Sequence, residues 1–143
     1  MAVGGLTDLS AESAGSAADI LLDVGYNDFQ GMVHANGRDV QLKDNAGDLT
    51  LGQILVNGLL DVVTNRGAIV QDATSTIDTL GEASFTARNA ASPADIRLNN
   101  SNNKFRSLVN VDGRNIEVND SAFVNSSTAF LWTLRFPANL VNR

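Results

Sequence analysis

The stretch Ala18-Asp19-Ile20-Leu21-Leu22 returns later in the chain as Ala94-Asp95-Ile96-Arg97-Leu98. The same shift aligns residues 18–44 with residues 94–120 without a gap and gives ten identities over 27 positions. Most of the other positions keep their character, as Val40 does with Ile116. An ungapped repeat of this length is typical of solenoids, in which coils stack in register and each coil covers the open edge of the last.

Around the repeated motif, apolar and polar residues alternate in short runs, which predicts half-buried β-strands. The runs lie at residues 20–22, 40–42, 49–51, 54–56, 60–62, 83–87 and 116–118. Turn-forming pairs such as Asn36-Gly37, Asn57-Gly58 and Asp112-Gly113 separate them. Because Asn, Gly and Asp tolerate the backbone of tight turns, the sixteen Asn residues of the chain fit many strands joined by corners.

The repeat favours a parallel β-helix (β-solenoid), in which Asn side chains stack and hydrogen-bond from coil to coil. A β-sandwich is the alternative, because Asn57-Gly58 and Asp112-Gly113 also suit hairpin turns. Residues 51–63 also fit a helical spacing, although Gly58 in the middle of the segment weighs against a helix. The expected fold class is therefore all-β.

The chain divides into a solenoid and a tail. We expect residues 1–122 to form the solenoid, as one 76-residue unit followed by a partial second copy. The correspondence between the copies stops after Asp120, and residues 123–143 form a divergent tail that is rich in aromatic residues. We expect its alternating residues to act as a C-terminal cap or as an assembly strand that binds another copy end to end. These candidate residues are Phe130, Trp132, Leu134 and Phe136.

The overall composition restricts the function. A net charge of −6 makes nucleic acid an unfavourable partner, because the chain repels phosphate. The chain has no Cys, which removes disulfides and thiolate metal sites. It also has no membrane-spanning apolar run and no signal peptide, so an export signal would lie outside this chain.

The candidate catalytic residues form no recognised cluster in the sequence. A carbohydrate-cleaving β-helix needs grouped carboxylates beside cations. The residues considered are Asp61, Asp72, Asp78 and Glu82, with Arg66 and Arg88. We interpret them as surface charges, and we interpret His34, the only histidine, as a solvent-facing strand residue. Phe29 and its copy Phe105 are expected in the core. We therefore expect no catalytic residues, no metal and no cofactor.

Five segments resemble the repeats of filamentous-haemagglutinin-like, autotransporter-type bacterial adhesins over about residues 5–120. These are residues 19–22, 27–29, 37–44, 48–52 and 67–72. The resemblance implies a right-handed parallel β-helix, exported as part of a rod on the cell surface. It also implies that such repeats serve mostly as a stalk.

The expected function is that of a structural or adhesive repeat segment of a large secreted bacterial surface protein. One alternative is a self-assembling filament subunit, joined end to end through its aromatic tail. A second alternative is a carbohydrate-active β-helix enzyme. The expected partners are neighbouring repeats or the chain itself, with a host or cell-surface glycan or protein left open.

Overall fold

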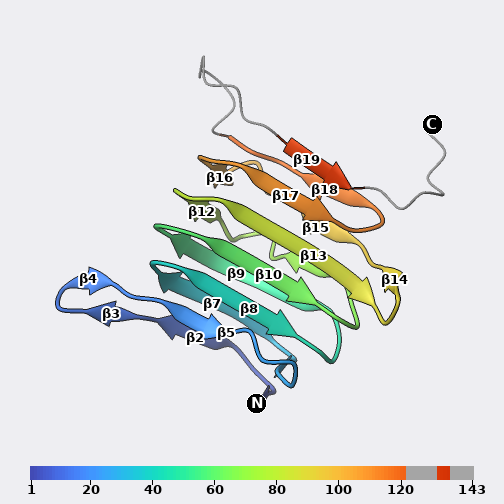
Figure 1. The fold of residues 1–143 in the computed structure, drawn as a ribbon, viewed down its shortest axis with the longest axis horizontal. Helices are drawn as coiled ribbons and strands as arrows, with labels where there is room; N and C mark the ends of the chain where they lie inside the picture. The colour runs from blue at the N-terminus through green and yellow to red at the C-terminus, as the bar shows by residue number, and fades with distance from the viewer. Residues whose placement is uncertain (122–131, 136–143) are drawn as a thin grey trace.

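A computed structural model describes residues 1–121 and the backbone of residues 132–135 (Figure 1). All of the regular structure in these residues is β-strand, and none of them forms a helix long and apolar enough to cross a membrane. The strands are β1 (Ala2–Val3), β2 (Thr7–Ser10), β3 (Glu12–Ser13), β4 (Ser16–Ala17), β5 (Ile20–Leu22), β6 (Asp28–Phe29), β7 (Met32–Gly37), β8 (Val40–Asp44), β9 (Leu49–Val56), β10 (Leu60–Thr64), β11 (Ile69–Gln71), β12 (Ile77–Thr79), β13 (Ala83–Asn89), β14 (Ser92–Pro93), β15 (Ile96–Leu98), β16 (Lys104–Phe105), β17 (Val109–Asp112), β18 (Ile116–Val118) and β19 (Trp132–Arg135).

The strands stack as parallel ladders in two main sheets, and the chain alternates between the sheets as it winds. One sheet, here the β5 sheet, runs in the order β5-β8-β10-β13-β17-β19. The opposite sheet, here the β9 sheet, stacks β2, β7 and β9, then β11 and β12, then β15 and β16, and pairs β15 with β18. Each coil places one strand or strand pair in each sheet, as Figure 1 shows. The predicted β-solenoid is confirmed.

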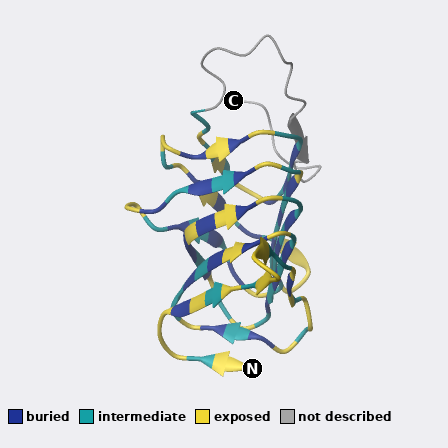
Figure 2. Ribbon diagram, turned by 90° about the vertical axis from the view of Figure 1, so that its left-hand side faces the viewer, coloured by how far each residue is buried: buried dark blue, intermediate teal, exposed yellow. Residues whose placement is uncertain are grey.

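The core lies between the two sheets and is filled by aliphatic side chains and three Phe residues. Every second residue of β8 and β10, and of residues 83–87 in β13, is buried, and the residues between them are half-buried (Figure 2). Phe29 and Phe105 are buried as predicted, and Phe105 packs edge-to-face against Phe85 with ring centroids 6.0 Å apart. Such contacts add to the free energy gained by burying apolar surface.

The two alternative folds are wrong for the described residues. All ladders are parallel except the hairpins β3–β4 and β13–β14 and the isolated bridge between Arg66 and Asn89, so the chain is not a β-sandwich. The segment 51–63, which also fits a helical spacing, contains parts of β9 and β10. Asn57-Gly58 forms the corner between these two strands, which pair with neighbouring coils and not with each other.

The 76-residue repeat is not a whole number of coils. Ile20 stacks on Val40, Val40 on Leu60 and Leu60 on Ala83, which takes the chain three coils along the β5 sheet. Ile96, the copy of Ile20, lies half a coil further on, in the β9 sheet opposite Ile69. One repeat therefore spans three and a half coils, and the second copy is turned to the opposite side of the solenoid.

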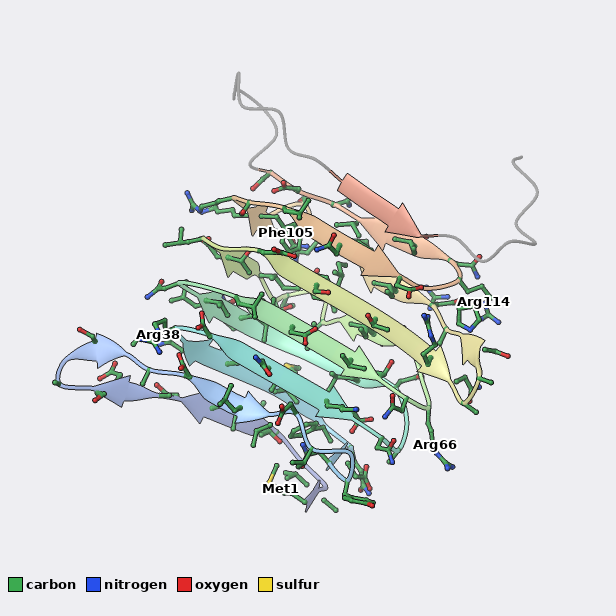
Figure 3. All side chains as sticks on the ribbon, viewed as in Figure 1. Met1, Arg38, Arg66, Phe105 and Arg114 are labelled. Carbon is green, nitrogen blue, oxygen red and sulfur yellow. The ribbon has the colours of Figure 1, made fainter. Side chains whose placement is uncertain are left out.

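Contacts within the first copy recur in the second copy, on the opposite side of the solenoid. Arg38 pairs with Asp19 with a hydrogen bond of 2.8 Å from Nε, and Arg114 pairs with Asp95 at the same distance. Figure 3 shows Arg38 and Arg114 on opposite edges of the stack. The hairpin β3–β4 and its copy around β14 also project from opposite sides in Figure 1. The second copy thus makes the same local contacts as the first, but on the opposite side of the solenoid.

The corners of the coils are built from stacked small and polar residues. A Cβ atom on Gly67 would lie 2.1 Å from the carbonyl oxygen of Gly47 in the coil before, so glycine is needed at position 67 for the corners to approach. Beside them, Asn65 Nδ2 donates to Asn45 Oδ1 at 2.9 Å. The Asn stacking predicted for the corners is therefore present here.

Candidate functional site

The carboxylates considered for catalysis are distributed over separate parts of the solenoid, and several are already engaged. Asp78 in β12 accepts hydrogen bonds from Arg106 at 3.1 and 3.2 Å, and Lys104 lies 4.0 Å away. Arg88 pairs instead with Asp112. A surface carboxylate that is paired with an arginine contributes to solubility and to contact between coils. It is not positioned as one of two carboxylates that transfer protons.

The other acidic candidates are also separate from one another. Glu82 accepts a hydrogen bond from Asn110 Nδ2, and Asp72 lies in the turn after β11. Asp61 is half-buried in β10, and burial raises the pKa of this carboxyl, with a smaller contribution from nearby Asp23. Over residues 1–121, no group of three or more His, Asp or Glu residues is arranged to hold a metal ion.

A groove with a volume of about 450 Å³ lies on the outer face of the β9 sheet. Its lining residues are Leu6, Met32, His34, Gln53, Asp72, Thr74 and Ser75. His34 is half-buried in the groove, and its Nε2 lies 3.2 Å from Met32 Sδ. The prediction that His34 is a solvent-facing strand residue is confirmed in part: His34 lies on the outer face of β7, but it is half-buried in a groove that was not predicted.

Two irregularities in the coils create this groove. Val33 stacks on Leu51 but Ala35 stacks on Ile54, so His34 faces two residues of β9, Gly52 and Gln53. This is a β-bulge, a feature that often lies beside functional sites. The His34 and Met32 side chains lie over Gly52, where a Cβ atom would be only 2.1 Å from the imidazole Cδ2.

The second irregularity is the loop between β11 and β12, which leaves the sheet and forms one wall of the groove. Asp72 accepts hydrogen bonds from the backbone N–H and hydroxyl of Thr74 at 2.9 and 2.6 Å. These bonds lower the pKa of the Asp72 carboxyl, so it is a fixed anion. The Ser75 hydroxyl donates to the carbonyl oxygen of Asp72 at 2.8 Å. Because this bond engages the hydroxyl, the groove offers polar contacts rather than an activated nucleophile.

Two of the four residues proposed for capping or assembly lie outside the described residues. Phe130 and Phe136 are among those not described. Trp132 and Leu134 belong to β19, whose backbone extends the β5 sheet in parallel with β17. Trp132 is level with Val109, and Leu134 with Val111. The strand expected in the tail is therefore present in the register of the solenoid.

An apolar surface at the N-terminal end was not predicted from the sequence. Five of the large apolar residues that are exposed belong to the first coil and the turn after it. They are Met1, Leu6, Leu21, Val24 and Tyr26. A comparison of the two copies would have found them, because four of the equivalent residues are polar. These four are Glu82, Arg97, Asn100 and Asn102.

The comparisons with known proteins identify the family of the repeat. No curated protein and no solved structure matches it. A family described as repeats of unknown function (DUF5649) matches residues 1–36 and, immediately afterwards, residues 37–112. The second match has the same length as the period found in the sequence. Because the two matches cover well over half of the sequence, the chain belongs to this family of repeats.

Proposed function

We propose that this chain is a structural segment of a rod-shaped bacterial surface protein, in which successive 76-residue units stack end to end. One observation carries the proposal: the same contacts recur at the same spacing in both copies. The backbone N–H of Phe29 donates to Asp44 Oδ1 at 2.8 Å, and that of Phe105 donates to Asp120 Oδ1 at 3.2 Å. A unit that repeats its internal contacts extends a solenoid indefinitely.

The stacking geometry gives the length that each unit adds. Neighbouring strands lie about 4.8 Å apart, so three and a half coils add about 17 Å. Each unit thus adds little length and many coil-to-coil contacts, which makes the stack resistant to bending. It therefore suits a stiff stalk that carries other parts of a protein.

Export to the cell surface, and adhesion there, rest on the resemblance to adhesin repeats and on the composition. The chain has no Cys and carries a net charge of −6, which keeps an exposed rod soluble. The alternative of a filament subunit is supported by the apolar residues at the N-terminal end and the aromatic tail. The alternative of a carbohydrate-active enzyme has less support, because the groove contains Asp72 and His34 but not the paired carboxylates that glycosidases use.

A chain with an extra unit tests the structural role. An additional copy of residues 37–112, inserted after Asp112, keeps the repeat in phase. Small-angle X-ray scattering should then show a maximum dimension about 17 Å longer, with an unchanged cross-section. Thermal unfolding should remain cooperative. A globular second body, or an extra unit that is unfolded by circular dichroism, would contradict the proposal.

A further inference from the structure

The first coil differs from its copy in burial, although the two have the same strands. Met1 is 54% exposed, whereas its equivalent Ile77 is fully buried. Ile20 is 8% exposed and its equivalent Ile96 is fully buried. Three other inward-facing residues in or next to β2 and β5 are only partly buried, whereas their equivalents in the second copy are fully buried. They are Leu9 with its equivalent Phe85, Ala11 with Ala87 and Leu22 with Leu98.

The second copy shows what buries these positions. In that copy, β13 pairs with β10, and β15 pairs with β11. β2 and β5 are the equivalents of β13 and β15, and each stands at the end of its ladder among the described strands. Figure 2 shows the coil that carries the N-terminus at the open end of the stack, with much of it exposed. The missing neighbours are therefore equivalents of β10 and β11.

We infer that this N-terminal edge is a docking surface for a further unit of the repeat joined in one polypeptide, which supplies the strands Leu60–Thr64 and Ile69–Gln71. The inference rests on the proposed function and adds to it the partner, the edge and the register. By the pairing in the second copy, Leu60 of the partner repeat lies opposite Thr7, and Ile69 lies opposite Ile20. An edge strand of this kind presents unpaired backbone groups that a further strand satisfies.

A side-chain hydrogen bond that is present at Asn103 but not at its equivalent Asn27 also fits a docked repeat. In the second copy, Gln71 and Asn103 exchange two side-chain hydrogen bonds, of 2.7 and 2.9 Å. Asn27, the equivalent of Asn103, donates to Leu22 O at 2.9 Å as Asn103 does to Leu98 O. Within residues 1–121, no Gln side chain is hydrogen-bonded to Asn27 as Gln71 is to Asn103. A docked repeat would supply its own Gln71 at that position.

One of the exposed apolar residues, Val24, lies where the partner repeat would make contact. Asn100 Nδ2 donates to the carbonyl oxygens of Ala73 and Ser75, in the coil before it. The equivalent of Asn100 is Val24, which is 60% exposed. Replacing a hydrogen-bonding residue by an apolar one at a coil-to-coil contact favours burial against another coil.

The phase of the repeat identifies the occupant as residues 37–76 of a repeat that runs into Met1. Ile77 is the equivalent of Met1. If residues 37–76 of another unit are placed ahead of Met1, residue 76 is followed by Met1 as it is followed by Ile77 in this chain. The strands agree: β1 pairs with β6 in the register in which β12 pairs with β16. Ala2 stacks on Asp28 as Asp78 stacks on Lys104, with the same separation along the chain. The first coil therefore has the register that residues 37–76 of a unit joined ahead of it would fit.

The test is a fusion in which residues 37–76 precede Met1 of the full chain. Hydrogen exchange should slow at least tenfold at the backbone amides of β2 and β5 that face the added strands. A matched fusion, with Val62→Asp and Ile69→Asp in the added segment only, should leave these amides as fast as in the unfused chain. A second readout is Asn27→Leu, which should lower the melting temperature more in the fusion than in the unfused chain.

Unchanged exchange at β2 and β5 in the fusion would overturn the docking inference. If the chain with an inserted unit still lengthens by about 17 Å, the structural role stands and only the docking inference fails. If neither result is seen, both fail. Dimers of the unfused chain that slow exchange at β2 and β5 would show that a separate molecule occupies the edge, and would contradict the occupant named here.

Discussion

Gln71 and Asn103 hold two adjacent coils together from inside the solenoid. Gln71 Nε2 donates to Asn103 Oδ1, Asn103 Nδ2 donates to Gln71 Oε1, and Asn103 Oδ1 also accepts the backbone N–H of Ile77 at 3.0 Å. Asn103 is fully buried. Buried amides are stabilising only when they are paired, so this pair fixes the register of the coils that carry it.

Replacing Asn103 should therefore be strongly destabilising. Asn103→Leu keeps the approximate volume but leaves Gln71, Ile77 N–H and Leu98 O without this partner. We expect a loss of about 3 kcal/mol in the free energy of unfolding, measured by urea denaturation. Asn27→Leu is the matched control and should cost only about 1 kcal/mol, since Asn27 has no such Gln partner within residues 1–121. Equal losses would contradict the different roles of the two residues.

The glycine stack at one corner gives a directional prediction. Gly67→Ala places a Cβ atom 2.1 Å from the Gly47 carbonyl oxygen, and this backbone atom has no free rotation to relieve the clash. We expect a loss of about 2–3 kcal/mol. Gly47→Ala meets nothing within 4 Å and should change the free energy of unfolding by less than about 1 kcal/mol. Chemical denaturation of the two variants measures the difference.

Asp61 should make the stability depend on pH in an unusual direction. Burial raises the pKa of its carboxyl in the folded chain, so the folded state binds this proton more tightly than the unfolded state. Stability from this group is then lost as the pH rises from the unfolded value, about 3.9, through the raised folded value. Asp61→Asn should raise the melting temperature at pH 7 and have little effect at pH 3.

Asp95 should behave in the opposite way. The hydrogen bond from Arg114 lowers the pKa of the Asp95 carboxyl, so its contribution is present above the unfolded pKa and is lost as the pH falls through the folded value. Asp95→Asn should lower the melting temperature at pH 7, and the difference from the unmodified chain should be smaller at pH 2. A difference of the same size at both pH values would contradict this assignment.

The hairpins that project from the coils contain strained alanines at equivalent positions. Ala14 has φ 52° and Ala90 has φ 53°, in the left-handed region that costs a side chain about 1–2 kcal/mol. Ala90→Gly should raise the free energy of unfolding by about 0.5 kcal/mol, after the greater entropy of unfolded glycine is subtracted. Ala91→Gly, at a residue without positive φ, should lower it. Thermal unfolding of both variants distinguishes the two effects.

The sequence predicted the fold because the repeat preserves the residues that make coil contacts. Asp19, Phe29, Arg38 and Asp44 recur as Asp95, Phe105, Arg114 and Asp120, and these residues make equivalent contacts in the two copies. The alternation of apolar and polar residues predicted the buried residues of β8 and β10, because side chains point alternately inward and outward along a strand.

The half-coil shift and the groove were not predictable in this way. The length of the repeat does not tell how much chain one coil takes, and the coils are unequal: the step from Ala83 to Val109 is longer than the step from Val40 to Leu60. The groove depends on a bulge at Gly52, which leaves no pattern in a single sequence. The N-terminal apolar surface was visible only in the differences between the copies, such as Leu21 against Arg97.

The most direct test of the half-coil shift is the distance between equivalent residues on the two copies. Because the chain has no Cys, Leu21→Cys and Arg97→Cys allow two spin labels to be placed for pulsed electron resonance. The shift places the labels on opposite sheets, about 17 Å apart along the axis and about 10 Å apart across it. With both labels pointing outward, the predicted distance between positions 21 and 97 is about 30 Å. The control pair, Leu21→Cys with Asn110→Cys, lies on one sheet and should give about 20 Å. A measured distance of about 20 Å or less between positions 21 and 97 would place the copies on the same face and contradict the half-coil shift.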